Sequence, residues 1–171
     1  SSNWRTCVDG GCLWYDGVDD SLEVDVDDWI GNFTVSQWVW ANSTTLPDYA
    51  SVFAVSDNAG SNTSFQHAVF SGEWRLHNNQ THAFGDIEAQ QWMHLVTVFD
   101  SGNVRQYFDG VLVRTTTFPS GSLNNLDLYK LGVNRAQSTF FEGMIDKVMV
   151  WDSALTDGDI TRLNRDIYRD C

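Results

Sequence analysis

The feature that most limits the fold is a series of short apolar stretches separated by turn residues about every 8 to 12 positions. In residues 22–26 the apolar and polar residues alternate, as in a strand with one buried face. Asp109-Gly110 is a strong hairpin signal between residues 104–108 and 111–117. The 171 residues are 42% apolar, which is enough for one core. The pattern predicts an all-β fold, a two-sheet antiparallel β-sandwich.

Residues 144–151 favour a strand that is at least half buried, with an irregularity at Asp146 and Lys147. We expect this last strand and the first strand, which follows Cys12, to be neighbours. The chain would then close its core at this point.

One short C-terminal helix is predicted directly after this strand. Thr156 is in place as the N-cap residue and Asp159 as its capping-box partner. Leu155 and Ile160 have the spacing of a hydrophobic staple. These signals favour a helix of about two turns.

Residues 32–40 have two faces of different character. Phe33, Val35 and Val39 share one face with Gln37, and Trp38 lies on the other. We assign the Phe33 face to the core, where Gln37 is the misfit. Residues 92–99 form the most apolar stretch and are expected to be a central strand.

The chain is strongly acidic, with a formal net charge of −13. A nucleic-acid partner is not expected, because Lys130 and Lys147 are the only lysines and phosphate binding needs clustered basic residues. No apolar stretch reaches the roughly 18 residues of a membrane helix, so membrane insertion is not expected. Acidity suits divalent cations, but adaptation to salt is an alternative cause.

Three cysteines lie near the two ends of the chain. We interpret residues 1–11 as a polar tail pinned by cysteine and residues 12–171 as a single domain. A Cys7–Cys171 disulfide is the first expectation, because it would tether the ends of a closed sandwich. Cys7–Cys12 is the second and Cys12–Cys171 the third, and each leaves one cysteine spare for an intermolecular bond.

Four N-glycosylation sequons begin at Asn32, Asn42, Asn62 and Asn79. Such sites are modified on the surface of secreted chains. Together with the cysteines they favour a secreted protein, or one on the surface of a cell or virion.

Four segments in order carry a resemblance to a known family: LWYDGVDDSLEV, FTVSQWVWAN, WMHLVTVFDSGNVRQYFDGVLV and FEGMIDKVMVWDSALTDGDI. Over residues 12–164 the chain resembles the laminin-G-like, concanavalin A-like jelly-roll family. The resemblance implies two curved sheets of about six or seven strands each and, in many members, a calcium ion and a carbohydrate or matrix ligand. The fold carries lectins, adhesion modules, hydrolases and structural domains, so it does not imply one function.

An acid-rich turn, Asp16-Gly-Val-Asp19-Asp20, offers the hard oxygen ligands that calcium prefers. Related sequences also place an acid at the position of Asp146. We therefore predict a calcium site shared by Asp16 or Asp19 and Asp146. The alternative is that Asp16 and Asp20 cap the turn by accepting hydrogen bonds from backbone amides.

Glu23, Asp25 and Asp27 share one face of a strand, an arrangement similar to that of concanavalin A-like glucanases. The third acid is a short Asp and the strand is near the start of the chain, which both count against catalysis. We therefore interpret the three acids as a solvated sheet edge and predict a protein that is not an enzyme.

Trp40, Tyr49 and Trp74 are candidate carbohydrate-binding residues, because an aromatic ring with an exposed face suits stacking on a sugar. The alternative is a thick aromatic core, since the chain holds eight tryptophans.

Our first hypothesis is a non-catalytic extracellular module that binds glycan or matrix through loops at one edge of the sandwich, with calcium as a structural ion. The second is a self-assembling structural glycoprotein of a fibre, appendage or virion. The third is a glycoside hydrolase, which depends on the three acids from Glu23 to Asp27 alone.

Overall fold

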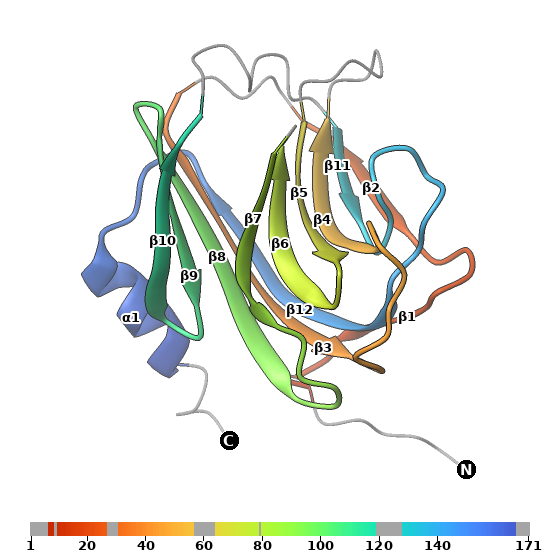
Figure 1. Ribbon diagram of the computed structural model, residues 1–171. Helices are drawn as coiled ribbons and strands as arrows, with labels where there is room; N and C mark the ends of the chain where they lie inside the picture. Colours follow the sequence, from red (N-terminus) through yellow and green to blue (C-terminus); the bar gives the residue numbers. More distant parts are fainter. Residues whose placement is uncertain are drawn as a thin grey trace.

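The computed structural model describes residues 7, 8, 10–26, 31–56, 64–78, 80–118 and 128–166. These residues form two six-stranded antiparallel sheets and one helix (Figure 1). The two-sheet sandwich and its single C-terminal helix are therefore confirmed. Within the described ranges, no helix is long and apolar enough to cross a membrane.

Sheet A contains the first and last strands of the chain as neighbours, as expected. Leu13 of β1 pairs with Ile145 of β12. The spatial order is β1, β12, β3, β8, β9, β10, with bounds Leu13–Asp16, Glu142–Trp151, Phe33–Ala41, Trp92–Asp100, Asn103–Phe108 and Val111–Thr117.

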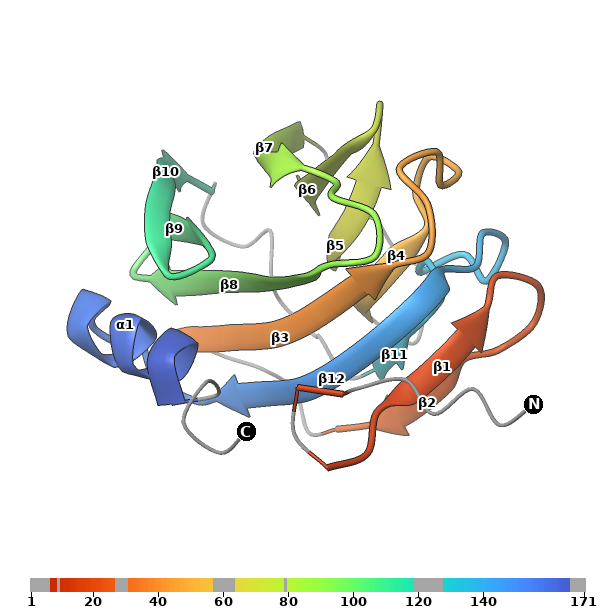
Figure 2. The ribbon, with the colours of Figure 1, turned by 90° about the horizontal axis from the view of Figure 1, so that it is seen from below.

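Sheet B packs against the concave side of sheet A (Figures 1 and 2). Its spatial order is β2, β11, β4, β5, β6, β7, with bounds Leu22–Asp25, Leu128–Leu131, Ser51–Ser56, Ser64–Phe70, Glu73–Asn78 and Gln80–Asp86. The β7 strand was missed in the sequence. Ala83 and Gly85 give it little apolar alternation, and its register with β6 shifts between Trp74 and Arg75.

The core between the sheets is rich in aromatic rings. Phe33 stacks on Phe99 with 4.1 Å between ring centroids, and both rings contact Phe65 of the opposite sheet. Val35 and Val39 are fully buried beside them, so the assignment of the Phe33 face to the core is confirmed.

Gln37, the misfit on this face, belongs to a buried polar network that joins the two sheets. Its Nε2 lies 3.0 Å from Nδ1 of His67 in sheet B, and Nε2 of His67 lies 2.7 Å from Oγ1 of Thr97 in sheet A. All three side chains are fully buried. Hydrogen bonding offsets the desolvation of Nε2 of Gln37 and of the His67 and Thr97 side chains, whereas Oε1 of Gln37 has no hydrogen-bond partner among the described residues.

Helix α1, Asp157–Asp166, covers the β8–β9 end of the outer face of sheet A (Figure 2). Its buried Ile160 packs in a cluster with Val96, Val98 and Tyr107. Leu155 contacts the same cluster, as the predicted staple requires. The helix has ten residues, about one turn more than expected.

The capping box is confirmed, because the amide of Asp159 donates to Oγ1 of Thr156 at 3.3 Å and the amide of Thr156 donates to Oδ2 of Asp159 at 3.1 Å. Polar bonds also attach the helix to the sheet. The hydroxyl of Tyr107 donates to Oδ1 of Asp157 at 2.5 Å, and Nδ2 of Asn164 donates to the carbonyl of Asp109 at 3.0 Å.

A segment next to β1 covers the other end of this outer face. Cys7 forms a disulfide with Cys12, with 5.4 Å between their Cα atoms. The expected Cys7–Cys171 pairing is therefore wrong. Only four residues, among them the flexible Gly10-Gly11 pair, separate Cys7 from Cys12, so the two cysteines reach bonding range. Cys171 itself lies outside the described residues.

Val8, inside this disulfide loop, is buried against Trp38 and Trp92. Its amide donates to Oδ2 of Asp146 at 3.0 Å. Part of the expected tail thus packs on sheet A, and this contact buries Trp38, which alternation had placed on the outer face.

The irregularity expected in the last strand is confirmed. The pairing of β12 with β3 shifts register between Asp146 and Met149, and Lys147 has a positive φ of 45°. The amide of Lys147 donates to Oδ1 of Asp146 at 2.7 Å, so the carboxylate stabilises the bulge.

Candidate functional site

The three predicted carbohydrate-binding aromatics do not lie together. Trp74 is fully buried between the sheets, where its Nε1 donates to Sδ of Met93 at 3.2 Å, so its assignment to a surface site is wrong. Trp40 lies on the outer face of sheet A, with its ring 6.2 Å from that of Trp14. Tyr49 lies on sheet B. Only Tyr49 and Trp40 therefore remain as accessible candidates.

Tyr49 is held at the outer face of sheet B, in the loop between β3 and β4. It is 38% exposed and adopts a positive φ of 68°. Its ring centroid lies 5.3 Å from that of Phe70 and 5.3 Å from that of His77. The amide of Tyr49 donates to the carbonyl of Val69 at 2.7 Å, which fixes the loop on β5. The ring is thus positioned by a rigid sheet while part of it contacts solvent.

Polar groups surround this ring on the same face of the sheet. In β6 the side chains of Trp74 and Leu76 are buried, whereas Glu73, Arg75 and His77 are partly exposed. The Arg75 guanidinium is 5.6 Å from the centre of the Phe70 ring and forms an ion pair with Glu73. We call Tyr49, Phe70, Glu73, Arg75 and His77 the Tyr49 patch.

Two nitrogen atoms of the Tyr49 patch are buried without a hydrogen-bond partner, namely Nε of Arg75 and Nδ1 of His77. Burial, assisted by the positive charge of Arg135, lowers the pKa of His77 below its usual value. The imidazole is therefore neutral at pH 7 and offers one donor and one acceptor. The patch combines an aromatic surface with donors and acceptors, which is the chemistry of a hydroxyl-rich ligand site.

Sequence reasoning found Tyr49 but missed the other four residues of the patch. The signal was present in the alternation of Glu73, Arg75 and His77 with Trp74 and Leu76. The same alternation would have placed Trp74 in the core.

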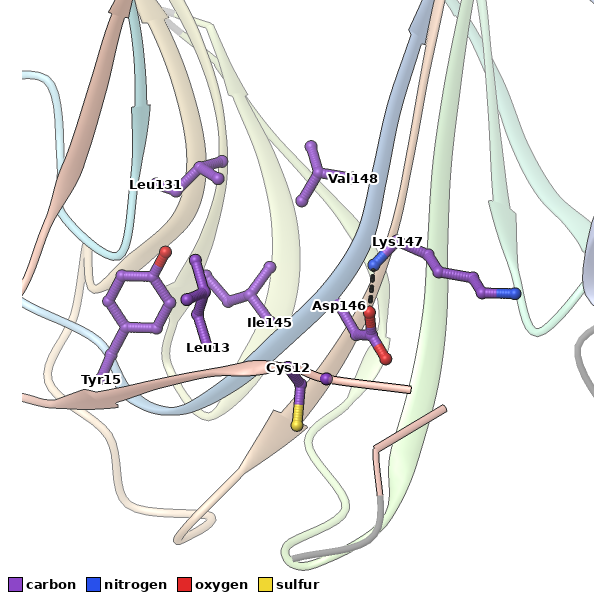
Figure 3. A pocket seen from close by; sticks show the side chains of 9 residues that line it. Cys12, Leu13, Tyr15, Leu131, Ile145, Asp146, Lys147 and Val148 are labelled. Atoms are coloured by element: carbon purple, nitrogen blue, oxygen red, sulfur yellow. Dashed lines mark hydrogen bonds between the residues drawn. The ribbon is translucent and has the colours of Figure 1, made fainter. Parts of the chain in front are cut away.

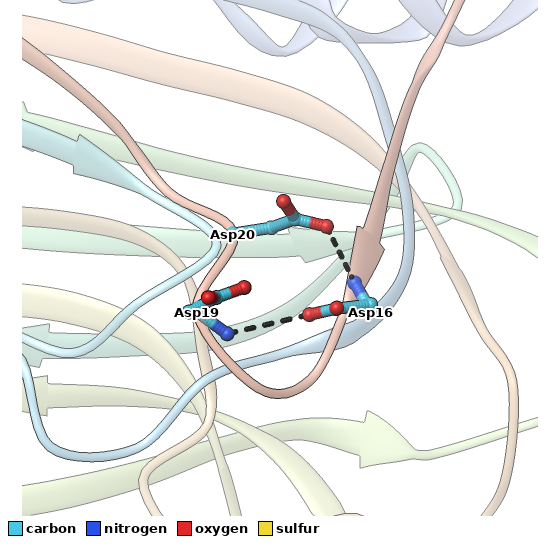
Figure 4. Close-up of side chains that lie close together, drawn as sticks. All are labelled: Asp16, Asp19 and Asp20. Carbon is cyan, nitrogen blue, oxygen red and sulfur yellow. Dashed lines mark hydrogen bonds between the residues drawn. The ribbon is translucent and has the colours of Figure 1, made fainter.

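The acid-rich turn between β1 and β2 brings three carboxylates together. Ligand oxygens of Asp16, Asp19 and Asp20 all lie within 4.8 Å of one another, and all three residues are exposed (Figure 4). Oδ1 of Asp16 accepts from the amides of Val18 at 2.8 Å and Asp19 at 3.3 Å. Backbone hydrogen bonds, that of Val18 above all, lower the pKa of Asp16. The turn is therefore capped by hydrogen bonds from backbone amides, as the alternative hypothesis expected. Its three carboxylates are also suitable ligands for a hard cation.

Asp146 does not join this cluster. Asp16 pairs with Glu142 across the β1–β12 ladder, and Asp146 is four residues farther along the strand. At about 3.4 Å per residue, this places it more than 10 Å from the turn. The shared site with Asp146 is therefore wrong, because that carboxylate is used by the bulge and by the amide of Val8.

The acidic strand β2 lies at the edge of sheet B. Glu23 accepts a hydrogen bond from Gln137 and has an ion pair of 3.8 Å with Lys130. Asp25 pairs with Leu128 on the same ladder, and Asp27 lies outside the described residues. Glu23 is thus engaged by neighbouring side chains of the sheet edge.

Two sequons can be placed. Asn32 is exposed and Asn42 is partly buried; Nδ2 of Asn42 donates to Oε1 of Glu142 at 2.6 Å. Asn62 and Asn79 lie outside the described residues.

These features agree with a comparison of the sequence with family models. The model described as the concanavalin A-like lectin/glucanases superfamily, Laminin_G_3, matches residues 16–161. The chain belongs to this superfamily. No curated protein matches this sequence.

Solved structures share the fold. Domain 4 of AbnA, an extracellular arabinanase from Geobacillus stearothermophilus in complex with arabinotriose, has a TM-score of 0.68 and 23% identity over 92% of this chain and 82% of that one. A native heptameric SAP-like pentraxin from Limulus polyphemus has a TM-score of 0.70 and 16% identity, over 94% and 84% of the two chains. The binding domain of Botulinum neurotoxin DC, solved with rat synaptotagmin II, has a TM-score of 0.70 and 14% identity over 92% and 45%.

Proposed function

We propose that this protein is a non-catalytic extracellular module that binds glycans through the Tyr49 patch. The observation that carries this proposal is the Tyr49 ring, 38% exposed and fixed against Phe70 and His77 beside the polar groups of β6. A sugar ring stacks on such a surface through its C–H groups while its hydroxyls bond to neighbouring polar side chains.

Two further observations support this function. The superfamily includes lectins, and the similar domain of the arabinanase was solved with a bound arabinotriose. The Cys7–Cys12 disulfide and the sequons at Asn32 and Asn42 suit an oxidising, extracellular location.

A glycan array followed by calorimetry tests the proposal. We expect binding to one class of neutral glycan, because the acidic chain disfavours anionic sugars. Tyr49→Ala should weaken binding about tenfold or more, since it removes the stacking surface. Trp14→Ala is the matched control, because Trp14 is 39% exposed but lies on sheet A. Equal loss in both variants, or no glycan bound by the wild type, would reject the Tyr49 patch as a glycan site.

We propose calcium as a structural ion in the Asp16, Asp19 and Asp20 turn. The three exposed carboxylates fit the oxygen ligands that calcium prefers. Starting from chelated protein, calcium at about 100 times its dissociation constant should stabilise the fold by about 2.7 kcal/mol and raise the melting temperature. Asp19→Asn should reduce this increase. An unchanged melting temperature with calcium would show that the turn is closed by its backbone hydrogen bonds alone.

A second candidate function, assembly into a larger structure, is favoured by strand β10. It is the outermost strand of sheet A in the described part of the chain, and Val111, Leu112 and Val113 are 64%, 44% and 42% exposed. An apolar edge strand pairs readily with a second chain. Light scattering should then show particles that grow with concentration and that Leu112→Lys disperses. A wild-type monomer at all concentrations would exclude this function.

A further inference from the structure

The outer face of sheet A has a partly exposed strip of large apolar side chains beside strand β1. Trp14 of β1 pairs with Met144 of β12, and Met144 pairs with Trp40 of β3. The ring centroids of Trp14 and Trp40 are 6.2 Å apart. Trp14 is 39% exposed and Trp40 is partly exposed, so both rings meet solvent. We call Trp14, Met144 and Trp40 the tryptophan strip.

The direction of the β1 side chains places this strip on the outer face. Figure 3 shows Leu13 and Tyr15 beside the pocket between the two sheets, whereas the sulfur of Cys12 points to the opposite side of the strand. That sulfur lies 3.6 Å from Sδ of Met144. Alternate residues of a strand share a face, so Trp14 lies on the same side as Cys12.

A glycosylation sequon begins next to the tryptophan strip. Asn42, Ser43 and Thr44 directly follow Ala41, the last residue of β3. The amide of Asn42 donates to the carbonyl of Glu142 at 3.2 Å, so the β3–β12 ladder continues to this residue. Asn42 therefore shares the outer face with Trp40, which is two positions, or about 6.8 Å, away along the strand.

The side chain of Asn42 is oriented by Glu142. Nδ2 of Asn42 donates to Oε1 of Glu142 at 2.6 Å. Glu142 is held in turn by the β1–β2 turn, because a Cβ atom at Gly17 would lie only 3.0 Å from Cβ of Glu142. A primary amide has two N–H groups, so this hydrogen bond uses one and leaves the other for a substituent.

We propose that Asn42 carries an N-linked glycan whose first N-acetylglucosamine stacks on the tryptophan strip. In the modification, Nδ2 attacks the anomeric carbon of a lipid-linked oligosaccharide. A C–N bond forms, the C–O bond to the pyrophosphate breaks, the lipid pyrophosphate leaves and Nδ2 loses one proton. The N–H that remains on Nδ2 still donates to Glu142, which keeps the attached sugar beside Trp40.

The tryptophan strip suits an attached sugar better than a free one. The C–H face of a sugar ring packs on an aromatic surface, but a single such contact is weak. Attachment at Asn42 gives the sugar a high effective concentration at Trp40, so a weak contact is enough. The strip lies on the sheet opposite the Tyr49 patch, and its glycan is independent of ligand binding there.

The test compares sequon variants secreted from glycosylating eukaryotic cells. Peptide mass spectrometry should find the glycan on Asn42 of the wild type. Thr44→Ala removes the sequon at an exposed position and keeps the Asn42 side chain, and Thr44→Ser keeps the sequon as the matched control. The wild type and Thr44→Ser should melt about 2–4 °C above Thr44→Ala, because the stacked sugar stabilises the folded chain.

NMR shows where the sugar lies. The indole N–H signals of Trp14 and Trp40 should differ between the wild type and Thr44→Ala. An endoglycosidase that leaves one N-acetylglucosamine on Asn42 should preserve both this difference and the higher melting temperature, because the first sugar makes the contact.

A second set of variants separates stacking from a general effect of glycosylation. Trp14→Ala should reduce the melting difference between the glycosylated and Thr44→Ala forms by about half or more, since it removes part of the strip. Val111→Ala, at an exposed position on β10, should leave the difference unchanged. The proposal is overturned if Asn42 is unmodified, if the indole signals of Trp14 and Trp40 are the same with and without the sequon, or if Trp14→Ala leaves the melting difference intact.

Discussion

The outer faces of the two sheets differ in how they are covered. Sheet A is covered at both ends, by helix α1 over Val96 and Val98 and by the Cys7–Cys12 segment over Trp38, so most of β3 and β8 is buried on both faces. In sheet B, β4 and most of β5 are also buried on both faces, but β6 keeps one face partly exposed, with alternating buried and partly exposed side chains. The covered face stabilises the fold, and the open face is the one that can meet a ligand.

The largest expected difference is in the free energy of unfolding, between a variant on the covered outer face of sheet A and one on the outer face of sheet B. Trp38→Ala should lower the free energy of unfolding by about 3–5 kcal/mol, because it empties a buried site under Val8 and beside His94. His77→Ala, on the outer face of sheet B, should lower it by about 1 kcal/mol or less. Urea denaturation of both variants measures this contrast. Equal losses would mean that the two faces contribute alike to stability.

The covered face should also make stability depend on pH. Burial lowers the pKa of His94 to about 4, against 6.5 in an unfolded chain. Between these values the unfolded state binds the extra proton, so the free energy of unfolding should fall as the pH drops from 6.5 towards 4, by about 1.4 kcal/mol per pH unit. His67 in the core, with a pKa lowered to about 3, acts in the same direction.

His94→Gln tests this dependence. The variant should flatten the fall in stability between pH 6.5 and 4 by up to about 3 kcal/mol relative to the wild type. His77→Gln should change the slope less, since His77 is partly exposed. Denaturation at a series of pH values distinguishes the slope from any loss of stability that is the same at every pH. An unchanged slope in His94→Gln would show that His94 titrates normally in the folded protein.

The smallest predicted effect concerns the helix that provides the cover. Thr156→Ala removes the N-cap of α1 and should destabilise the protein by about 1 kcal/mol in thermal or chemical denaturation. Thr161→Ala, at an exposed position within the helix, should be neutral or slightly stabilising. If the two variants behave alike, the capping box does not stabilise the helix.

Local signals in the sequence predicted the strands and the capping box well, because both depend on residues close together in the chain. Thr156 and Asp159 are three positions apart, and the core face of β3 follows from alternation alone. The cover over Trp38 was not predictable in this way. It depends on where the Cys7–Cys12 segment docks, which is decided by contacts between distant residues.

The candidate site was predicted only in part for the same reason. Tyr49 was found because it is an aromatic residue in a loop, but Phe70 and His77 became its neighbours only through the pairing of β5 and β6. Asp146 was placed near the wrong partners, since its sequence position fixes the strand but not the register of β1 against β12.

The central claim, that the open face of sheet B binds glycan, is tested most directly by NMR with the best glycan from an array. At saturation the Nε–H signal of Arg75 and the amides of Tyr49 and His77 should shift, because they lie in the Tyr49 patch. The indole N–H signals of Trp14 and Trp40, on sheet A, should stay in place. Shifts confined to Trp14 and Trp40 would contradict the account and move the binding site to sheet A.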